Sequence, residues 1–240
     1  MHSDGRPVAL VTGAGRGIGA ELSRMLAGEG YAVGLLGRDE QKLTVVAEQL
    51  DVPTRVVRAD VTVPADARAA VAAVRADLGP IDLLVNNAGI REQRSTLPWE
   101  ADAHDWWHVV EVNLRGVVLV TSAVLPLMVA RGSGRVVDLG SGVGQRAEPR
   151  YSAYSVSKSA ALHWLQNVVT ALGDDPQVRL VSASPGLVRT DMTETMWGGT
   201  GEDPVEFGSL EPLLRFVRRF AAGELDHLHG QFVHTVKDGY

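Results

Sequence analysis

Short apolar runs alternate with segments of helical periodicity along nearly the whole chain. The first run, 8–11, is continuous, which is typical of a strand buried on both faces of a parallel sheet. The runs predict strands over 8–11, 31–36, 54–58, 81–85, 135–139, 178–183 and 232–236. The segments between them predict a helix ending near residue 28 and further helices over 40–50, 64–78, 102–125, 152–172 and 213–220. Such alternation predicts an α/β fold, with a doubly wound, mostly parallel sheet of seven strands and helices on both faces.

The chain is expected to form a single domain over residues 1–240. Its 240 residues suffice for one substantial core, and no linker, repeat or low-complexity tract interrupts the pattern. Residues 1–6 form a polar N-terminal tail. The stretch that begins at Pro185-Gly186 is too long for an ordinary connection, so we interpret 187–210 as a variable substrate loop.

Composition excludes several classes of protein. The net charge is −6 and basic residues do not cluster, so we expect no nucleic-acid partner. No apolar run reaches the roughly 18 residues that span a bilayer, so we expect no membrane insertion. The chain has no cysteine, which excludes thiol chemistry and fits a cytoplasmic location.

A glycine-rich segment directly follows the first predicted strand and opens the first helix. Gly13, Gly17 and Gly19 are spaced G-x-x-x-G-x-G, which differs from the more common G-x-G-x-x-G pattern. Glycines allow a diphosphate close to the backbone, and the helix N-terminus supplies amides and the positive end of a dipole. The strand–turn–helix context therefore predicts a phosphate-binding turn.

Tyr154 and Lys158 lie four residues apart in the predicted helix 152–172, so their side chains share one face. A neighbouring cation favours the phenolate and lowers a tyrosine pKa. A tyrosine tuned in this way could exchange a proton with a substrate oxygen. Ser141 follows the fifth predicted strand, and its hydroxyl should point to the same region. The pentapeptide alone is also compatible with an ordinary surface helix.

Taken together, these motifs resemble the short-chain dehydrogenase/reductase family in its compact single-domain form, which has a Rossmann-type fold. The resemblance extends from about residue 8 to 239, with the motifs in order at the carboxyl ends of strands. It implies that Ser141 orients the substrate, that Tyr154 is the general acid/base, and that Lys158 binds the nicotinamide ribose and lowers the Tyr154 pKa. Asn113 would support a water relay, although an asparagine there could simply bend its helix.

The resemblance also implies a set of cofactor contacts. The glycine turn would hold the diphosphate, Asp60 and Val61 the adenine, and the segment after the sixth strand the nicotinamide carboxamide, with Thr190 as its side-chain ligand. The full set of implied cofactor-binding residues is Gly13, Gly15, Arg16, Gly17, Ile18, Gly19, Gly37, Arg38, Asp60, Val61, Asn87, Ala88, Gly89, Tyr154, Lys158, Pro185, Gly186, Val188 and Thr190.

The choice of cofactor depends on the end of the second strand. An acidic residue there would bind a ribose 2′-hydroxyl and repel a 2′-phosphate. This position carries Gly37, followed by Arg38, and Arg16 is expected at the same corner, so we predict NADP(H). The alternative is NAD(H), which follows if Asp39 reaches the ribose instead.

Two departures from the family pattern affect the expected site. Asp138 stands where relatives often have asparagine, and the last strand ends early, at Lys237-Asp238-Gly239-Tyr240.

The implied reaction is hydride transfer between NADP(H) and a small-molecule carbonyl or secondary alcohol. A non-catalytic nucleotide sensor and a related epimerase or dehydratase are the competing hypotheses. Retention of Asn113, Ser141, Tyr154 and Lys158 opposes the sensor, and the short chain opposes the epimerase.

Other candidate features point to weaker hypotheses. His104 and His108 lie four residues apart, but no third ligand is evident, so we expect no metal. Scattered arginines near the expected site are interpreted as solvated rather than as an anion site: Arg91, Arg94, Arg146 and Arg150. Helix 152–172 is apolar on more than one face, which predicts a homo-oligomer, a tetramer or dimer, with Trp164 or Val168 near the partner.

Overall fold

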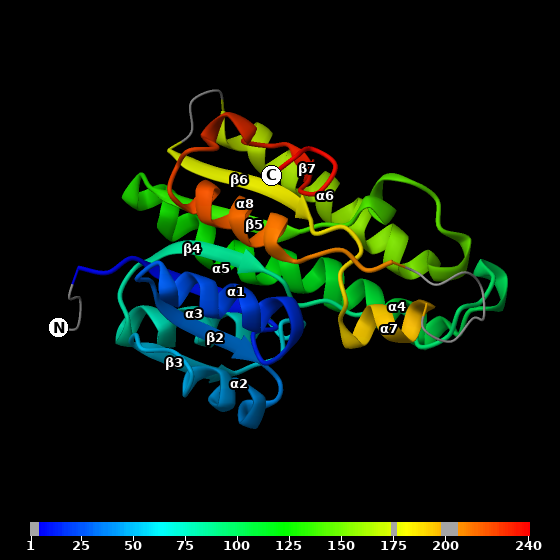
Figure 1. The fold of residues 1–240 in the computed structure, drawn as a ribbon, viewed down its shortest axis with the longest axis horizontal. Helices are drawn as coiled ribbons and strands as arrows, with labels where there is room; N and C mark the ends of the chain where they lie inside the picture. Colours follow the sequence, from blue (N-terminus) through cyan, green and yellow to red (C-terminus); the bar gives the residue numbers. More distant parts are fainter. Residues whose placement is uncertain (1–4, 174–176, 198–205) are drawn as a thin grey trace.

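The computed structural model describes residues 5–173, 177–197 and 206–240 and contains one parallel sheet (Figure 1). Its strands are β1 (Val8–Thr12), β2 (Ala32–Gly37), β3 (Thr54–Arg58), β4 (Ile81–Asn86), β5 (Gly134–Leu139), β6 (Val178–Ser184) and β7 (Phe232–His234). The order across the sheet is β3-β2-β1-β4-β5-β6-β7. Every pairing is parallel, so the expected mostly parallel seven-stranded fold is confirmed.

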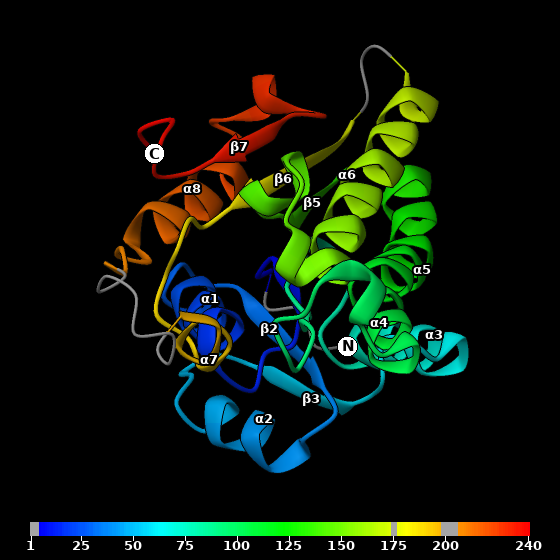
Figure 2. The same cartoon turned by 90° about the vertical axis from the view of Figure 1, so that its right-hand side faces the viewer.

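Helices cover both faces of the sheet (Figure 2). They are α1 (Gly17–Gly28), α2 (Glu40–Ala47), α3 (Pro64–Asp77), α4 (Ala103–Val110), α5 (Gly116–Arg131), α6 (Ser152–Leu172), α7 (Asp191–Trp197) and α8 (Glu211–Ala221). Short 3₁₀ turns are η1 (Pro98–Glu100), η3 (Gly142–Gln145), η4 (Pro149–Tyr151) and η5 (Asp226–Leu228), and η2 (Glu111–Arg115) is a π-helical turn.

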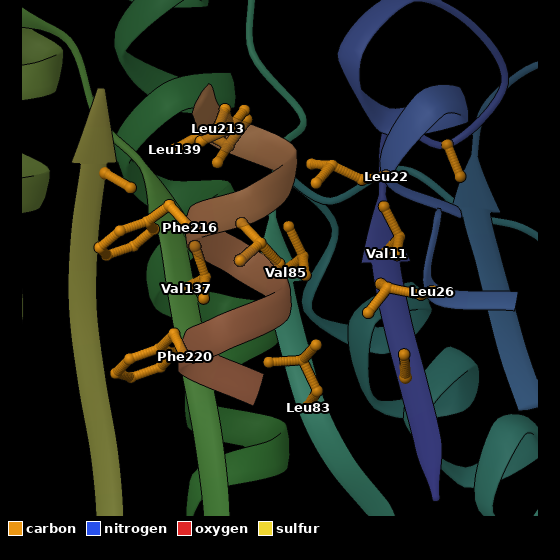
Figure 3. Close-up of a cluster of buried hydrophobic side chains, with 14 of the residues drawn as sticks. Val11, Leu22, Leu26, Leu83, Val85, Val137, Leu139, Leu213, Phe216 and Phe220 are labelled. Carbon is orange, nitrogen blue, oxygen red and sulfur yellow. The ribbon is translucent and has the colours of Figure 1, made fainter. Parts of the chain in front are cut away.

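Side chains that alternate along each strand divide the core into two layers. Ala9 and Val11 of β1 face α1, α2 and α8, whereas Val8 and Leu10 face α3, α5 and α6. Figure 3 shows the first layer, where Phe216 and Phe220 of α8 lie over the strands. Burial on both faces explains why β1 and β2 carry no charged residue.

The helix predicted over 102–125 differs from the expectation at its end and in its middle. Pro126 does not end it, because α5 continues to Arg131 and stops at Gly132 in a left-handed conformation (φ 73°). Burial of Met128 beyond the proline favours continuation despite the hydrogen bond that proline cannot donate. The π-helical turn Glu111–Arg115 separates α4 from α5.

The same helical stretch corrects the expectation that no segment is long and apolar enough to span a membrane. Residues Ala103–Arg131 meet both criteria by length and composition. The buried side of this stretch, including Val120 and Val124, packs in the core layer beneath the sheet. A core helix therefore accounts for its apolar character.

The C-terminal third also differs in part from the expectation. The stretch predicted as irregular contains α7, and residues 198–205 of the expected substrate loop lie outside the described residues, as do residues 1–4 of the N-terminal tail. Strand β7 ends at His234 and is therefore shorter than the predicted 232–236. The Tyr240 ring then packs edge-on against Phe216, so the chain end covers α8.

Helix α6 has the predicted bounds, but its apolar residues are distributed differently from the expectation. Trp164 and Val168, which we expected near a partner subunit, are partly buried against this chain's own core. Val156 is the large apolar side chain of α6 that is clearly exposed, at 47%. The homo-oligomer stays a prediction.

We expect Phe216→Ala to lower the free energy of unfolding by about 3–5 kcal/mol, because it removes a fully buried ring from the α8 layer. Denaturant unfolding would measure this change. Leu127→Ala is the matched control, since Leu127 is 36% exposed and its loss should cost under about 1 kcal/mol. Equal effects of the two substitutions would contradict the packing described for α8.

Candidate active site

The glycine turn brings the start of α1 against the end of β4. A Cβ on Gly19 would lie 2.3 Å from the Gly13 carbonyl oxygen and 2.4 Å from Asn87 Nδ2. Gly13 and Gly17 have positive φ angles of 65° and 54°, which residues with side chains rarely adopt. These positions therefore require glycine for geometric reasons that are independent of any ligand.

Asn87 connects the turn to the sheet. Its Nδ2 donates to the carbonyl oxygens of Thr12 (2.8 Å) and Gly13 (3.1 Å). The backbone amides of Asn87 and Ala88 both donate to Thr12 Oγ1, each at 3.0 Å. The sequence analysis missed Thr12, which has only its position at the end of β1 as a signal. Together, Thr12 and Asn87 hold the glycine turn in one conformation.

The remaining residues of the turn have different environments. Gly15 lies against α2, where a Cβ would be 3.1 Å from Lys42 Cβ. Ile18 is partly buried and packs against the core layer that contains α1, α2 and α8. Arg16 precedes α1, and its guanidinium forms a 2.7 Å ion pair with Asp191 of α7. Both side chains of this pair are more than half exposed, so the ion pair adds little stability.

The second strand ends where it was expected to end, so Gly37 and Arg38 stand at the corner that follows β2. The strand ends at Gly37, and the exposed Arg38 follows it. Asp39 caps α2 by accepting from the Lys42 amide at 3.2 Å, and it pairs with Lys42 Nζ at 3.3 Å. The Lys42 amide, more than its ammonium group, lowers the Asp39 pKa. Asp39 is thus already engaged as a helix cap.

Asp60 and Val61 follow β3 at the neighbouring position. Partial burial of Asp60 acts to raise its pKa, but hydrogen bonds from Thr62 and the nearby Arg38 more than offset this, so the pKa is lowered. Asp60 Oδ1 accepts from the Thr62 amide (2.9 Å) and hydroxyl (2.8 Å). Val61 is buried against Gly116, where a Cβ would be 2.7 Å away. Side-chain hydrogen bonds thus hold this turn, and Asp60 lies near enough to Arg38 for the guanidinium to help lower its pKa.

The structure brings Tyr154, Lys158, Asn113 and Gly89 close to one another. Lys158 is 7% exposed and its Nζ donates to the Leu139 carbonyl at 2.7 Å. The same Nζ lies 5.9 Å from the centroid of the Tyr154 ring. A Cβ on Gly89 would be 3.7 Å from Lys158 Nζ and 3.3 Å from Asn113 Oδ1. A Cβ at position 89 would therefore be tight against Asn113 Oδ1 and in ordinary contact with Lys158 Nζ.

Asn113 lies in the π-helical turn and is fully buried. Its Oδ1 accepts from the Ile90 amide at 2.8 Å, and its Nδ2 donates to the Ile90 carbonyl (2.7 Å) and Ser157 Oγ (3.0 Å). Ser157 Oγ in turn donates to the Tyr154 carbonyl at 2.8 Å. The side chain therefore joins two segments rather than bonding to its own helix backbone, and the water relay stays a prediction.

Ser141 lies at the start of η3, where its hydroxyl accepts from the Val143 amide at 3.3 Å. The η3 turn is attached to α6, because Ser155 Oγ donates to the carbonyl oxygens of Val143 (3.2 Å) and Arg146 (3.0 Å). A Cβ on Gly144 would be 3.0 Å from Lys158 Cβ. The Ser141 segment is therefore docked on the helix that carries Tyr154 and Lys158.

The segment after β6 lies at the same edge of the sheet. Pro185 and Gly186 follow the strand, Gly186 with a φ of 75°. Val188 is buried and forms a parallel bridge with Gly208. Thr190 donates its amide to Thr193 Oγ1 at 2.9 Å and accepts from the Thr193 amide at 3.2 Å, so it caps α7. Its role toward a nicotinamide stays a prediction.

Asp138 is the departure from the family pattern that the structure explains least. The carboxyl group is 1% exposed; Oδ2 accepts from Ser182 Oγ at 3.3 Å, and Oδ1 has no hydrogen-bond partner in the described part of the chain. Burial raises the pKa of Asp138, although Lys158 and Ser182 oppose the rise. Burial therefore outweighs the nearby Lys158 ammonium group in setting the direction of this shift.

Two further residues contact α6 in ways that the sequence analysis missed. Glu92 is 4% exposed, and its carboxylate accepts from the amides of Ala153 (2.6 Å) and Tyr154 (3.3 Å). Trp106 also donates from its indole nitrogen to Ser152 Oγ at 3.1 Å. Glu92 has no sequence signal, since a glutamate in a polar loop is usually solvated.

The other candidate features form no second site among the described residues. No cluster of three metal-ligating side chains is present there, and His104 is exposed at the start of α4. Arg91 is not solvated as expected. Its guanidinium lies 5.4 Å from the Tyr151 ring centroid, and its Nε donates to the Met192 carbonyl at 3.3 Å. Arg94, Arg146 and Arg150 are exposed.

A seven-stranded parallel sheet with helices on both faces and a glycine turn after β1 defines a Rossmann-type fold. The model of the family described as short chain dehydrogenase matches residues 7–199. The chain belongs to this family of oxidoreductases.

Individual relatives cover most of the chain. Galactitol 2-dehydrogenase (L-tagatose-forming) of Cereibacter sphaeroides is 37% identical over 191 residues, 78% of this chain and 74% of its own. The structure of a single-substitution variant of actinorhodin polyketide ketoreductase with NADPH has a TM-score of 0.89 at 28% identity, covering 98% of this chain and 97% of its own. The 3-oxoacyl-[acyl-carrier protein] reductase of Brucella melitensis, in complex with NAD, has a TM-score of 0.85 at 28% identity, covering 97% and 96%.

We expect Asp138→Asn to stabilise the protein at neutral pH. Because burial raises the carboxyl pKa, the folded chain holds this proton to a higher pH than the unfolded chain, whose value is about 3.9. Stability from this group is therefore lost as pH rises from near 4 through the folded pKa, and stays constant above it. Asparagine does not ionise, so it avoids this loss of stability, and its side-chain oxygen can still accept from Ser182.

The gain should be on the order of 1 kcal/mol, which corresponds to about 2–4 °C in Tm for a chain of this size. Thermal unfolding of both proteins between pH 4 and pH 8 would measure it, with the exposed Asp51→Asn as the control. A variant whose Tm difference from wild type does not change with pH would show that Asp138 is not the group responsible.

Proposed function

We propose that this chain transfers a hydride between NADP(H) and a small-molecule carbonyl or secondary alcohol, with Tyr154 as general acid/base. The observation that carries the proposal is the position of Lys158. Its Nζ is held by the Leu139 carbonyl at 2.7 Å, next to Gly89 and 5.9 Å from the Tyr154 ring. A fixed cation this close to the ring can stabilise the negative charge that develops on the phenol oxygen as its proton moves to the substrate.

The cofactor, when bound, supplies the hydride, and the chain's own residues handle the proton. In the reducing direction Tyr154 donates its phenolic proton to the oxygen of the substrate as that oxygen gains negative charge. Ser141 donates a hydrogen bond to the same oxygen. Lys158 stabilises the tyrosinate that remains, and Asn113 holds the loop after β4 in place for the next cycle. The glycine turn supports diphosphate binding because it leads directly into the N-terminus of α1, whose first amides and dipole attract an anion.

NADP(H) is the cofactor that the β2 corner supports better. No carboxylate follows the strand directly, since Gly37 and Arg38 occupy these positions, and Asp39 is already engaged as the cap of α2. Arg16 is the second cation proposed for the 2′-phosphate, but it must exchange its ion pair with Asp191 to bind one. NAD(H) is the alternative, and solved relatives carry NADPH in one case and NAD in another.

The relatives indicate substrates of the polyol and oxoacyl or polyketide classes, through the names galactitol 2-dehydrogenase and ketoreductase. A panel of sugar alcohols, cyclic and linear ketones and 3-oxoacyl thioesters, assayed with both nucleotides, therefore tests the proposal. The competing hypothesis is a nucleotide sensor on the same fold. Tight nucleotide binding without turnover of any member of this panel would favour the sensor.

We expect Tyr154→Phe to lower kcat by at least about 10²-fold, because it removes only the hydroxyl that exchanges the proton. The dissociation constant for the nucleotide should change little, since Lys158 is retained. Tyr31→Phe is the matched control, because Tyr31 lies just before β2 at the opposite edge of the sheet. A Tyr154→Phe variant with near-normal kcat would exclude Tyr154 as the general acid/base.

We expect the wild type to prefer NADP(H) over NAD(H) by about 10²-fold in kcat/KM, from two partly exposed arginine–phosphate interactions. Combining Arg38→Ala with Arg16→Ala should remove most of this preference, whereas Arg68→Ala on the exposed side of α3 should not. The single variants divide the effect between the two arginines. A wild type that prefers NAD(H) would refute the assignment directly, and so would a double variant that keeps its preference for NADP(H).

A further inference from the structure

A buried carboxylate contacts the backbone of the proposed general acid/base. Glu92 lies in the loop after β4, and its side chain is almost fully buried at the start of α6. Its Oε1 accepts from the Ala153 amide at 2.6 Å and its Oε2 from the Tyr154 amide at 3.3 Å. Amides in the first turn of a helix have no partner within the helix, and a carboxylate there also interacts favourably with the helix dipole.

The loop that carries Glu92, residues 90–93, is itself attached to three other elements. Ile90 exchanges two hydrogen bonds with Asn113 in the π-helical turn. The Gln93 amide donates to Asp105 of α4 at 3.1 Å. Arg91 donates to the Met192 carbonyl of α7 and to the carbonyl of Glu92. The 90–93 loop therefore joins the first turn of α6 to the segments on both sides of the proposed site.

The two proposed site residues on α6 are held by separate contacts. Lys158 is fixed one turn further along the helix by the Leu139 carbonyl. Tyr154 lies in the first turn, where helices fray most readily, and its amide contacts Glu92. Loss of Glu92 would leave Lys158 in place and release the turn that carries the phenol. A displacement of about 1 Å in a reacting group can cost about 10²-fold in rate.

We propose that Glu92 is a positioning residue, which fixes the first turn of α6 so that the Tyr154 hydroxyl keeps its place relative to Lys158. The proposal rests on the proposed function, because it assigns a consequence for turnover to a contact with Tyr154. It predicts a specific pattern: kcat falls, while nucleotide affinity is retained, since Glu92 does not contact the glycine turn or the β2 corner. A general loss of folding would lower both quantities together.

Two substitutions weaken the contact between Glu92 and the α6 amides to different extents. Glu92→Gln keeps one oxygen that can accept from Ala153 but places an NH₂ group against the Tyr154 amide. Glu92→Ala removes both acceptors. We expect kcat to fall by about 10-fold to 10²-fold in Glu92→Ala, in line with a small misplacement of the phenol, and by less in Glu92→Gln. Glu100→Gln is the control and should leave kcat unchanged, because Glu100 is exposed and lies, like Glu92, in the connection between β4 and α4.

The experiment measures residue-resolved amide hydrogen exchange alongside kinetics and nucleotide binding for all four proteins. The expected result is faster exchange at the amides of Ala153 and Tyr154 in both Glu92 variants, graded as kcat is, with the dissociation constant for nucleotide within about 2-fold of wild type. Glu92→Gln keeps the test decisive should Glu92→Ala fail to fold.

Three outcomes would overturn the positioning role: unchanged exchange at the two amides, a Glu92→Ala variant with the kcat of wild type, or nucleotide affinity that falls in step with kcat. Failure of the proposed function is distinguishable from these, because it would be a wild type that turns over no substrate of the panel with either nucleotide. The exchange measurement does not depend on turnover and still decides whether Glu92 holds the first turn.

Discussion

The close approach of α1 to the end of β1 is the constraint on which the site depends. The helix begins so near the strand that a single methyl group on Gly19 would overlap the Gly13 carbonyl oxygen. Asn87 completes the contact from β4 by donating to two carbonyl oxygens of the turn. One strand end, one helix start and the loop after the neighbouring strand are thus fixed together. The proposed nucleotide and proton-transfer residues are arranged around this point.

Much of this arrangement follows from local sequence. Apolar runs identify strands buried on both faces, and helix-forming segments between them favour parallel pairing with helices on both sides of the sheet. The carboxyl ends of parallel strands meet at one edge of the sheet. The candidate site residues, although spread from Gly13 to Thr190 in the sequence, are therefore expected to converge at this edge. The structure places the segments that carry them at that edge.

Features that depend on tertiary contacts could not be predicted in this way. The helix through Pro126 continues because Met128 is buried beyond the proline, and a single-residue propensity contains no term for that burial. Glu92 has the sequence context of a solvated loop residue, yet the amides of α6, about 60 positions later, satisfy its charge. Asp138 was noticed as a departure from relatives, but only the fold shows that one of its oxygens has no partner in the described residues.

The bridge between Val188 and Gly208 has a consequence for how this chain can diversify. The Gly208 amide also donates to the Leu187 carbonyl at 2.8 Å, so the two ends of the intervening segment leave and rejoin the body of the protein side by side. A segment closed at its base can change length at little cost, because the entropy of loop closure grows only logarithmically. Changes of length between positions 188 and 208 would therefore leave the sheet intact, provided that Asp191 and Met192 keep their contacts with Arg16 and Arg91. The length of this segment can therefore vary while the strands and the helix that carries Tyr154 and Lys158 keep their places.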